Sequence, residues 1–386
     1  MKKKVFPFAL MCILLAGLIP SGPAAASPPQ IIYFASHTAG AGGYNLLALV
    51  AEGIIAKEKV KVRLVPAGSD VARTLMAYKG QAATSALTSI SGWQIQEGLE
   101  EFSAPDWGPT PVRYLWEPQY VGAAFVVRGD SPIKKISDLK GKKVAQMPGS
   151  PAPQLINEAF LAFGGLTWKD VITVPFPSPV AAYVGVIKQR IDSTFFNLVG
   201  SQAYELASMP CGIRYLEMPA SDKEGWKRLK TVCPSFSPRH ATVGADISEK
   251  NPKWVATMGY PNFLTWAKLD ENTAYYITKY INEAYPIYSK SNKSLKLDWT
   301  LEKCLSVWDG DVVPFHKGAI RYFKELGHWT PEREKMNQER IAHQAQLKKL
   351  WDATRKEAKQ KGFTGKEFAK FWMAKRAKAG FWTPTE

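Results

Sequence analysis

Residues 137–150 read SDLKGKKVAQMPGS and predict a turn, a strand and a helix start in immediate succession. Ser137 is expected to cap a helical turn, and Gly141 to end it in the left-handed conformation that glycine tolerates. A strand then begins at Val144, and its carboxyl end leads to a new helix at Ser150. Because a helix N-terminus offers unpaired N–H groups, this arrangement is suited to holding a polar or anionic ligand without catalytic residues.

Strand and helix patterns alternate on both sides of this stretch, which is typical of an α/β protein with parallel strands. The roughly 300 residues from 27 to 330 exceed one typical domain, so we expect two lobes. Lobe 1 is assigned residues 27–121 and 237–330, and lobe 2 residues 122–236. Residues 252–290 are expected to form helices that return to cover lobe 1. The predicted strands are residues 31–36, 60–65, 83–88, 112–116, 123–127, 143–146, 171–176, 193–198 and 213–218.

The first 26 residues have the composition of an export signal. Three lysines at 2–4 precede an apolar run at 5–19, and three alanines at 24–26 fit a small-residue cleavage site. A retained membrane anchor is the alternative, but Gly17 and Pro20 break the run short of the ~20 residues that a span needs. We therefore expect a periplasmic protein that is exported by a cleavable signal peptide.

Three cysteines lie beyond the signal segment, namely Cys211, Cys233 and Cys304. In an oxidising compartment Cys211 and Cys233 can form a bridge, and three separately buried thiols are the alternative. The five histidines are scattered without ligand spacing, so we expect no metal site and no cofactor.

The formal net charge of +16 becomes +13 without the three signal lysines, and residues 331–386 alone hold 14 basic and 7 acidic residues. A basic balance can indicate nucleic acid or an anionic membrane surface, but export argues against a nucleic-acid partner. We interpret most of the charge as solvated surface. Residues 331–386 form a basic helical extension whose apolar positions are expected to pack on the body, a partner surface being the alternative.

Three segments are expected at the carboxyl ends of strands, where α/β sheets bind ligands. They read SHTAGAGGYN at 36–45, PAGS at 66–69 and GSPAPQ at 149–154, and Asn197 ends a later strand. For Ser69, helix capping is an equal alternative. The candidate ligand-binding residues are Thr38, Tyr44, Asn45, Ser69, Thr88, Ser89, Tyr120, Ser150, Gln154 and Asn197.

Sequence patterns typical of cofactor binding or catalysis are incomplete. Gly40-x-Gly42 begins a dinucleotide fingerprint, but Asn45 occupies the third glycine position and no acidic residue ends the second strand. The sequence contains no His-Glu-x-x-His and no Gly-x-Ser-x-Gly, and its acidic residues cluster at caps and surfaces. An exported enzyme is therefore the weaker alternative.

The chain resembles the TAXI-type solute receptors of tripartite ATP-independent periplasmic (TRAP) transporters over roughly residues 31–329. VPFHKGAIRY at 313–322 is similar to the C-terminal signature of that family. DLKGK at 138–142 is less specific, because receptors of ATP-driven uptake systems also carry it. The other blocks that carry the resemblance are residues 31–56, 68–69, 126–131, 149–150 and 260–261.

The resemblance implies a type II-like periplasmic binding protein of two α/β lobes joined by hinge strands, with extra C-terminal helices here. It implies capture of a small, usually carboxylated solute, delivery to integral-membrane permease subunits, and no catalysis; we expect a monomer. Hinges are expected near residues 120–123 and 233–240. Arg113 and Arg239 lie near these crossings, where we expect solvated or structural roles, contact with a carboxylate being the alternative. The solute-binding component of an ATP-driven importer or of a sensor is the alternative.

One departure from the family bears on the solute. Where the family usually has Gly-Ser-Gly-Thr, residues 149–152 read GSPA, which removes hydroxyl and N–H donors. A larger, apolar or aromatic acid then becomes the expected solute, with aromatic partners drawn from Trp93, Trp116, Tyr120, Phe176 and Phe196, unless these are core residues.

Overall fold

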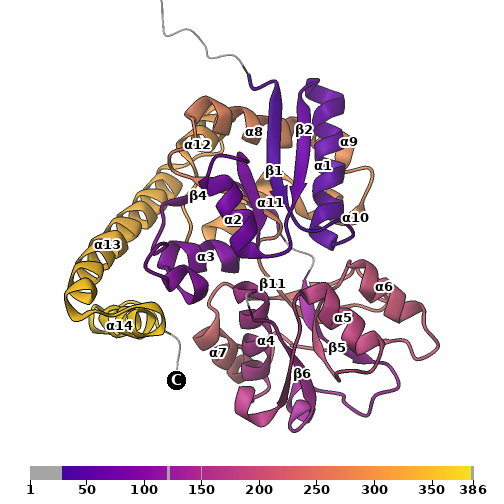
Figure 1. The fold of residues 1–386 in the computed structure, drawn as a ribbon. Helices are drawn as coiled ribbons and strands as arrows, with labels where there is room; N and C mark the ends of the chain where they lie inside the picture. Colours follow the sequence, from indigo (N-terminus) through magenta and orange to yellow (C-terminus); the bar gives the residue numbers. More distant parts are fainter. Residues whose placement is uncertain (1–27, 120–121, 149, 384–386) are drawn as a thin grey trace, which may run out of the picture.

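The computed structural model describes residues 28–119, 122–148 and 150–383. The expected export signal and Tyr120 lie outside these ranges. Figure 1 shows two lobes, one above the other, and a helical hairpin that runs down the outer side of the upper lobe. The expected two-lobe α/β architecture with extra C-terminal helices is confirmed. We call the two parts the first lobe and the second lobe, after the sheets described next.

The first lobe is built on a five-stranded sheet of order β2-β1-β3-β12-β4. β1 runs parallel to β2 and β3, whereas β12 is antiparallel to β3 and β4. In the core, Phe34 and Phe263 meet edge to face at 5.2 Å between ring centroids. The strands are β1 (Ile31–Ser36), β2 (Lys61–Pro66), β3 (Thr84–Leu87), β4 (Val112–Trp116) and β12 (Asn262–Trp266).

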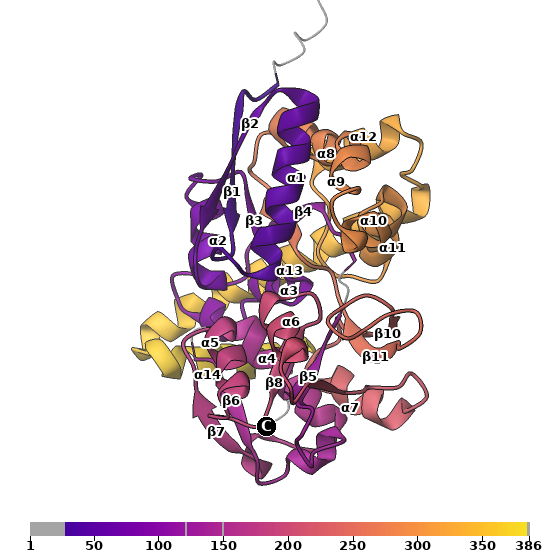
Figure 2. The same ribbon diagram turned by 90° about the vertical axis from the view of Figure 1, so that its right-hand side faces the viewer.

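Helices cover both faces of this sheet, and Figure 2 shows α8 to α12 gathered on one side of the first lobe. Apolar residues recur on the inner face of α1, from Leu46 to Ile54, which explains its position against the sheet. The helices are α1 (Gly42–Glu58), α2 (Asp70–Tyr78), α3 (Ser89–Glu97), α8 (Glu271–Glu283), α9 (Tyr285–Tyr288), α10 (Lys293–Asp298), α11 (Leu301–Asp309) and α12 (Lys317–Glu325), with a 3₁₀ turn at Glu100–Ser103.

The second lobe has a sheet of order β10-β11-β5-β8, with β9 also paired to β5. All of these pairings are antiparallel, so the expectation of parallel strands holds in this lobe only for β6 and β7. A parallel bridge between Val144 and Ser193 connects β6 to the chain just before β8. The strands are β5 (Ala123–Arg128), β6 (Lys143–Gln146), β7 (Ile172–Pro175), β8 (Thr194–Asn197), β9 (Ile213–Leu216), β10 (Ser237–Ala241) and β11 (Lys253–Thr257). The helices are α4 (Pro151–Phe163), α5 (Pro179–Ile187), α6 (Ser201–Ser208) and α7 (Lys223–Val232), with 3₁₀ turns at Ile136–Leu139 and Trp168–Asp170.

The stretch at 137–150 has the predicted order of elements, but its capping differs. A 3₁₀ turn ends before Gly141, whose φ of +70° is the expected left-handed conformation. Asp138, not Ser137, fixes the turn, because its carboxylate accepts the N–H groups of Lys134 and Lys135 at 3.0 and 3.1 Å. Ser150 occupies the cap position of α4, yet its side chain accepts no capping hydrogen bond.

The boundary between the lobes lies later than predicted. Residues 237–257, assigned to lobe 1, belong to the second sheet, because β10 pairs antiparallel with β11 and β11 pairs antiparallel with β5. Within residues 252–290, β11 and β12 are strands where helices were predicted. The chain therefore crosses between the sheets after β4 and again between β11 and β12, where Gln119 and Gly259 form an antiparallel bridge. The hinge predicted at residues 233–240 is wrong for the same reason.

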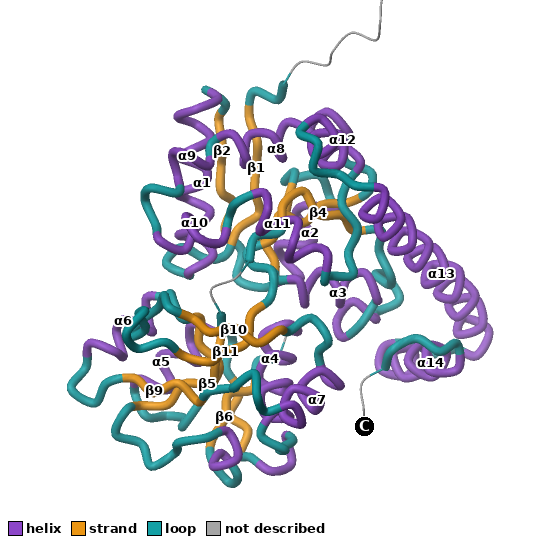
Figure 3. Tube along the Cα trace, turned by 180° about the vertical axis from the view of Figure 1, so that it is seen from behind, coloured by secondary structure: helices purple, strands orange, loops and turns teal. Residues whose placement is uncertain are grey.

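The C-terminal hairpin consists of α13 (Pro331–Lys361) and α14 (Gly365–Lys378), and it packs on the body as predicted. The Trp372 indole N–H donates to the carbonyl of Gly98 at 2.8 Å. Trp351 lies so close to Gly108 that a Cβ there would overlap its ring. Figure 3, seen from behind, shows α13 passing along the first lobe and α14 turning back at its end.

Cys211, Cys233 and Cys304 are free thiols, so of the two alternatives that the sequence left open the separate thiols hold, with Cys211 half-buried. Cys233 is packed in the core of the second lobe, whereas Cys304 is packed in that of the first. Among the described residues, no group of three histidine, cysteine, aspartate or glutamate side chains is arranged to hold a metal ion. In the same part of the chain, no helix is both long and apolar enough to cross a membrane.

Candidate ligand-binding cleft

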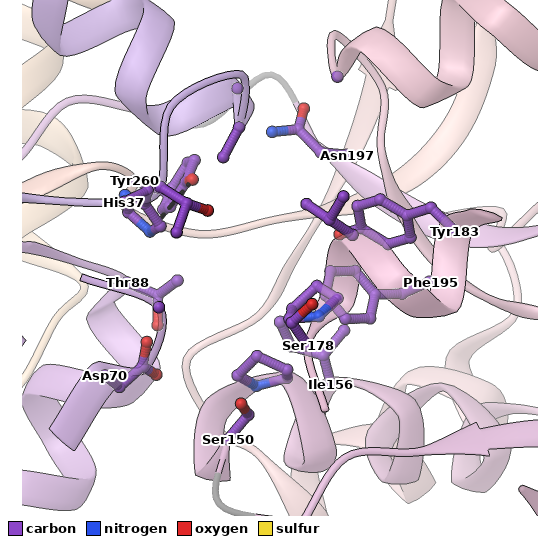
Figure 4. A pocket seen from close by; sticks show the side chains of 18 of the residues that line it. His37, Asp70, Thr88, Ser150, Ile156, Ser178, Tyr183, Phe195, Asn197 and Tyr260 are labelled. Atoms are coloured by element: carbon purple, nitrogen blue, oxygen red, sulfur yellow. Dashed lines mark hydrogen bonds between the residues drawn. The ribbon is translucent and has the colours of Figure 1, made fainter. Parts of the chain in front are cut away.

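A cleft of about 870 Å³, including its open mouth, lies between the two lobes. Figure 4 shows that its two walls come from different lobes and face each other. The first lobe contributes His37, Thr38, Ala41, Gly42, Gly68, Asp70, Arg73 and Thr88, the second contributes Ser150, Pro153, Ile156, Ser178, Pro179, Val180, Tyr183, Phe195, Asn197, Gly200 and Gln202, and Met258 and Tyr260 come from the second crossing.

Asp70 and Arg73, in the first turn of α2, are the charged side chains among the described residues of the cleft. They form a buried ion pair with each other, and Ser91 donates to the other Asp70 oxygen at 2.9 Å. Arg73 also donates to the carbonyls of Ala86 and Ala67, at 3.0 and 2.9 Å. These contacts hold the guanidinium in place, and among the described residues they leave one N–H on each of its terminal nitrogens without an acceptor. The cleft therefore has a fixed cation whose charge is offset by a neighbouring carboxylate.

His37 and Tyr260 form the back of the first-lobe wall. The tyrosine oxygen lies 3.4 Å from His37 Nε2, and the two rings meet edge to face at 5.2 Å between centroids. Burial and the nearby charge of Arg73 hold the pKa of His37 well below its ordinary value, so the imidazole is neutral at pH 7. Burial likewise raises the pKa of Tyr260, which keeps its hydroxyl protonated.

The second-lobe wall is mainly apolar. Tyr183 and Phe195 meet edge to face at 5.7 Å between centroids, and Ile156 lies beside them. Hydroxyl groups border this wall at two helix starts: Ser150 before α4, and Ser178, which caps α5 by accepting from the N–H of Ala181 at 3.3 Å. One wall thus offers hydrogen bonds and the other an apolar and aromatic surface.

At one rim of the cleft the lobes are in contact. A Cβ placed on Gly42 would lie 2.7 Å from Asn197 Nδ2, so a larger residue at position 42 would require the Asn197 side chain to move. Ser201 Oγ donates across the rim to the carbonyl of Gly40 at 3.4 Å. Asn197 itself is fixed by accepting the N–H of Val199 at 3.0 Å.

The structure places four of the predicted site residues in the cleft: Thr38, Thr88, Ser150 and Asn197. Five described ones do not line it: Tyr44, Asn45, Ser69, Ser89 and Gln154. Ser69 and Gln154 form hydrogen bonds with nearby backbone groups instead. The Ser69 hydroxyl accepts the N–H of Ala72 at 3.2 Å, and the side-chain oxygen of Gln154 accepts the N–H of Met147 at 2.7 Å. Tyr44 and Asn45 belong to α1 and Ser89 is buried in α3. Tyr120 lies outside the described residues.

The four described aromatic partners suggested by the sequence do not line the cleft. Trp93, Trp116 and Phe196 are core residues, and Phe176 packs against Gly185. Arg239 is structural, as expected, because it pairs with Asp298 at 2.9 Å.

The sequence interpretation missed His37, Asp70, Arg73, Ser178, Tyr183, Phe195 and Tyr260. The sequence pattern could have indicated Ser178-Pro179, because it follows β7 in the same way that Ser150-Pro151 follows β6. It could not have indicated Arg73, since nothing local distinguishes a helix residue that faces a cleft from one that faces the core.

The NMT1-like family model matches residues 37–327, three quarters of the chain. The chain belongs to the NMT1-like family. It is also similar to the alkanesulfonate-binding protein SsuA from Xanthomonas axonopodis pv. citri bound to MOPS, with 13% identity, a TM-score of 0.44, and 88% of this chain and 96% of that chain covered.

Two further solved structures are similar to this NMT1-like chain. The periplasmic aliphatic sulphonate binding protein SsuA from Escherichia coli has 14% identity and a TM-score of 0.42, covering 80% of this chain and 94% of its own. PhnD1 from Prochlorococcus marinus in complex with methylphosphonate has 14% identity and a TM-score of 0.41, covering 78% and 99%. At such TM-scores these likenesses say nothing about what the NMT1-like chain binds.

Proposed function

We propose that this NMT1-like protein is an extracytoplasmic receptor, which captures a small organic solute between its lobes and delivers it to a membrane permease. The observation that carries the proposal is the cleft, whose opposite walls come from two sheets joined by two chain crossings. A solute that touches both walls stabilises the closed arrangement, because its contacts are complete only there.

We propose an organic acid with an apolar or aromatic body as the solute. In the described contacts Arg73 keeps one N–H on each terminal nitrogen, which suits a carboxylate, and Tyr183 and Phe195 suit the body. Asp70 offsets part of the attraction of Arg73 for an anion. The apolar wall therefore supplies much of the binding free energy, and the polar wall supplies orientation.

Catalysis is not part of the proposal. Among the described residues, the side-chain partner of His37 is the Tyr260 hydroxyl, and no serine or threonine hydroxyl is hydrogen-bonded to the imidazole. Nucleophilic catalysis needs such a base beside its nucleophile. A chemical change in the bound solute during a single-turnover assay would contradict the receptor role.

The TRAP-type permease implied by the sequence resemblance is our first candidate for delivery. An ATP-driven importer is the second, because receptors of such systems also carry the block at 138–142. Permease genes beside this one support the first route, and an adjacent ATPase gene supports the second.

The solute prediction is tested by native mass spectrometry of the purified mature protein, which should reveal a retained organic acid. A thermal-shift panel of acids with and without aromatic bodies then ranks candidates. Replacing Ser150 or Asn197 with alanine should lower the affinity for the identified acid about 3- to 10-fold, the loss of one hydrogen bond.

The matched control is Ser208→Ala, because Ser208 is exposed on α6 away from the cleft. All three variants should keep the far-ultraviolet circular dichroism of the parent protein. Unchanged affinity in both cleft variants contradicts the assignment of the cleft.

A further inference from the structure

A second hollow lies in the first lobe, between the C-terminal hairpin and the body, and shares no lining residue with the cleft. It encloses about 940 Å³, including its open side. β4 and α12 form one side and α13 the other, and Figure 3 shows α13 passing these elements. The lining residues are Arg113, Ala267, Phe315, His316, Lys317, Ile320, Arg321, Lys324, Glu334, Asn337, Gln338 and Ile341.

Arg113, on β4, is a buried cation at the floor of this groove, with 8% of its surface exposed. Its Nη1 donates to the carbonyl of Val112 at 2.8 Å and to the side-chain oxygen of Gln344 on α13. Among the described residues, Arg113 has no ion pair, and no acceptor binds its Nε or Nη2. Burial lowers the pKa of Arg113 to about 10, so it remains charged at pH 7. A buried charge is ordinarily paired, which makes this one a binding group without its partner.

The rest of the groove is also basic. Lys317 and Arg321 both pair with Glu271, each at 3.1 Å, and Lys324 pairs with Glu334 at 3.0 Å. In the described part of the chain, the ion pairs of these three cations involve two carboxylates, and Arg113 adds a fourth positive charge.

Two further lining residues, His316 and Asn337, contribute no negative charge to the groove. His316 adds no charge, because burial lowers its pKa to about 4. Asn337 is 1% exposed and uses its oxygen to accept the N–H of Phe315 at 2.8 Å, which leaves its amide N–H groups for a ligand.

We propose that this groove binds a small oxyanion, a carboxylate or a phosphate, with Arg113 as its principal partner and Asn337 and Lys317 around it. The guanidinium offers the N–H donors that both oxyanions match. Gln344 positions Arg113 from α13, and Asn337 lies on the same helix. A bound anion therefore ties the C-terminal hairpin to the sheet of the first lobe.

The test uses the full mature chain, freed of its solute, with inorganic phosphate and succinate as probes in calorimetric titrations at constant ionic strength. Saturable binding of at least one probe is expected, and the tighter of the two identifies the oxyanion class. Arg113→Gln should lower the affinity at least 10-fold, which is the loss of one charge-assisted contact. Lys317→Gln, at an exposed position, should lower it severalfold without touching the core.

Arg355→Gln is the matched control, since Arg355 is exposed on α13 beyond the groove and its loss changes the net charge equally. Ser208→Ala, on α6 and outside the lining of both the cleft and the groove, should also leave phosphate and succinate binding unchanged. If Arg113→Gln does not fold, Lys317→Gln against Arg355→Gln decides the matter alone. Equal affinity in the groove variants and the controls, or no saturable binding to the parent protein, overturns the proposal.

Discussion

Glu117, just after β4, is a fully buried carboxyl group beneath the point where the chain crosses between the lobes. In the described part of the chain, neither of its side-chain oxygens has a hydrogen-bond partner. A Cβ on Gly259 would overlap one of them, so the crossing strand fits against the acid only as glycine. Burial, and next the charge of Asp311, raise the pKa of Glu117 well above its ordinary value, so the acid is protonated at pH 7.

Glu117→Gln should therefore stabilise the protein at neutral pH. The folded protein binds this proton more tightly than the unfolded chain, whose pKa is near 4.5. The stability that comes from this protonated state is complete below about pH 4.5 and is lost as the pH rises toward the folded pKa. We expect the variant to gain about 1–3 kcal/mol at pH 8 and nothing near pH 4, measured by urea unfolding at both pH values.

Glu302→Gln on the exposed face of α11 is the control for this comparison. A gain that is the same at both pH values would mean that packing, and not the proton, is responsible.

Among single residues, the sequence identifies those whose role is set by their neighbours along the chain. Thr88 and Ser150 were found because helix starts are recognisable from serine, threonine and proline. Tyr183 and Arg113 were not assigned their positions, because facing a cleft or a groove depends on elements far away in the chain.

Among the elements, the C-terminal hairpin is joined to α3 through Glu97. Arg376 is fully buried and donates to the Glu97 carboxylate at 2.8 Å and to its carbonyl at 2.7 Å, while His343 lies 2.6 Å from the other carboxylate oxygen. Burial acts to raise the pKa of Glu97, but His343 and Arg376 outweigh it, so the pKa is lowered and the pair is ionised. The buried carboxylate of Glu97 thus helps to hold the basic C-terminal hairpin on α3.

Arg376→Ala should cost about 3 kcal/mol of unfolding free energy, because it removes one partner of a buried charge while His343 remains. Urea unfolding measures this, with Arg355→Ala as the exposed control. Adding Glu97→Gln to Arg376→Ala should recover part of the loss. A cost no larger than that of the control would show that the hairpin is held by its apolar contacts alone.

Local sequence patterns predict most of the helices and strands. The strands that were missed were missed for one common reason. β1 and β4 have the predicted bounds, because their burial pattern is local. β11 and β12 were missed since their aromatic residues fit helical spacing equally well, and only pairing with β5, β3 and β4 makes them strands. Antiparallel pairing across the sequence is invisible to periodicity.

For the whole molecule, the proposed function requires the lobes to move relative to each other. Spin labels at Lys79, which ends α2, and Lys188, which ends α5, report on the two sides of the cleft, and both positions are exposed. In a Cys211→Ser background, which removes the half-buried thiol, the retained solute should give a shorter and narrower distance distribution than the stripped protein. Pulsed electron–electron double resonance measures this change in the distance between the labels.

A label pair at Lys57 and Lys79, both in the first lobe, should give the same distance with and without solute. If the pair across the cleft is equally unresponsive, the solute does not close the lobes, and the receptor mechanism fails at that step.

The unequal walls of the cleft have a thermodynamic consequence. Burial of the wall around Tyr183 and Phe195 removes apolar surface from water and gives a negative heat-capacity change. Hydrogen bonds to the wall around Arg73 and Thr88 contribute mainly enthalpy. The binding enthalpy will therefore change with temperature chiefly through the second lobe, and two solutes with the same acid group but different bodies will differ most in their heat-capacity change of binding.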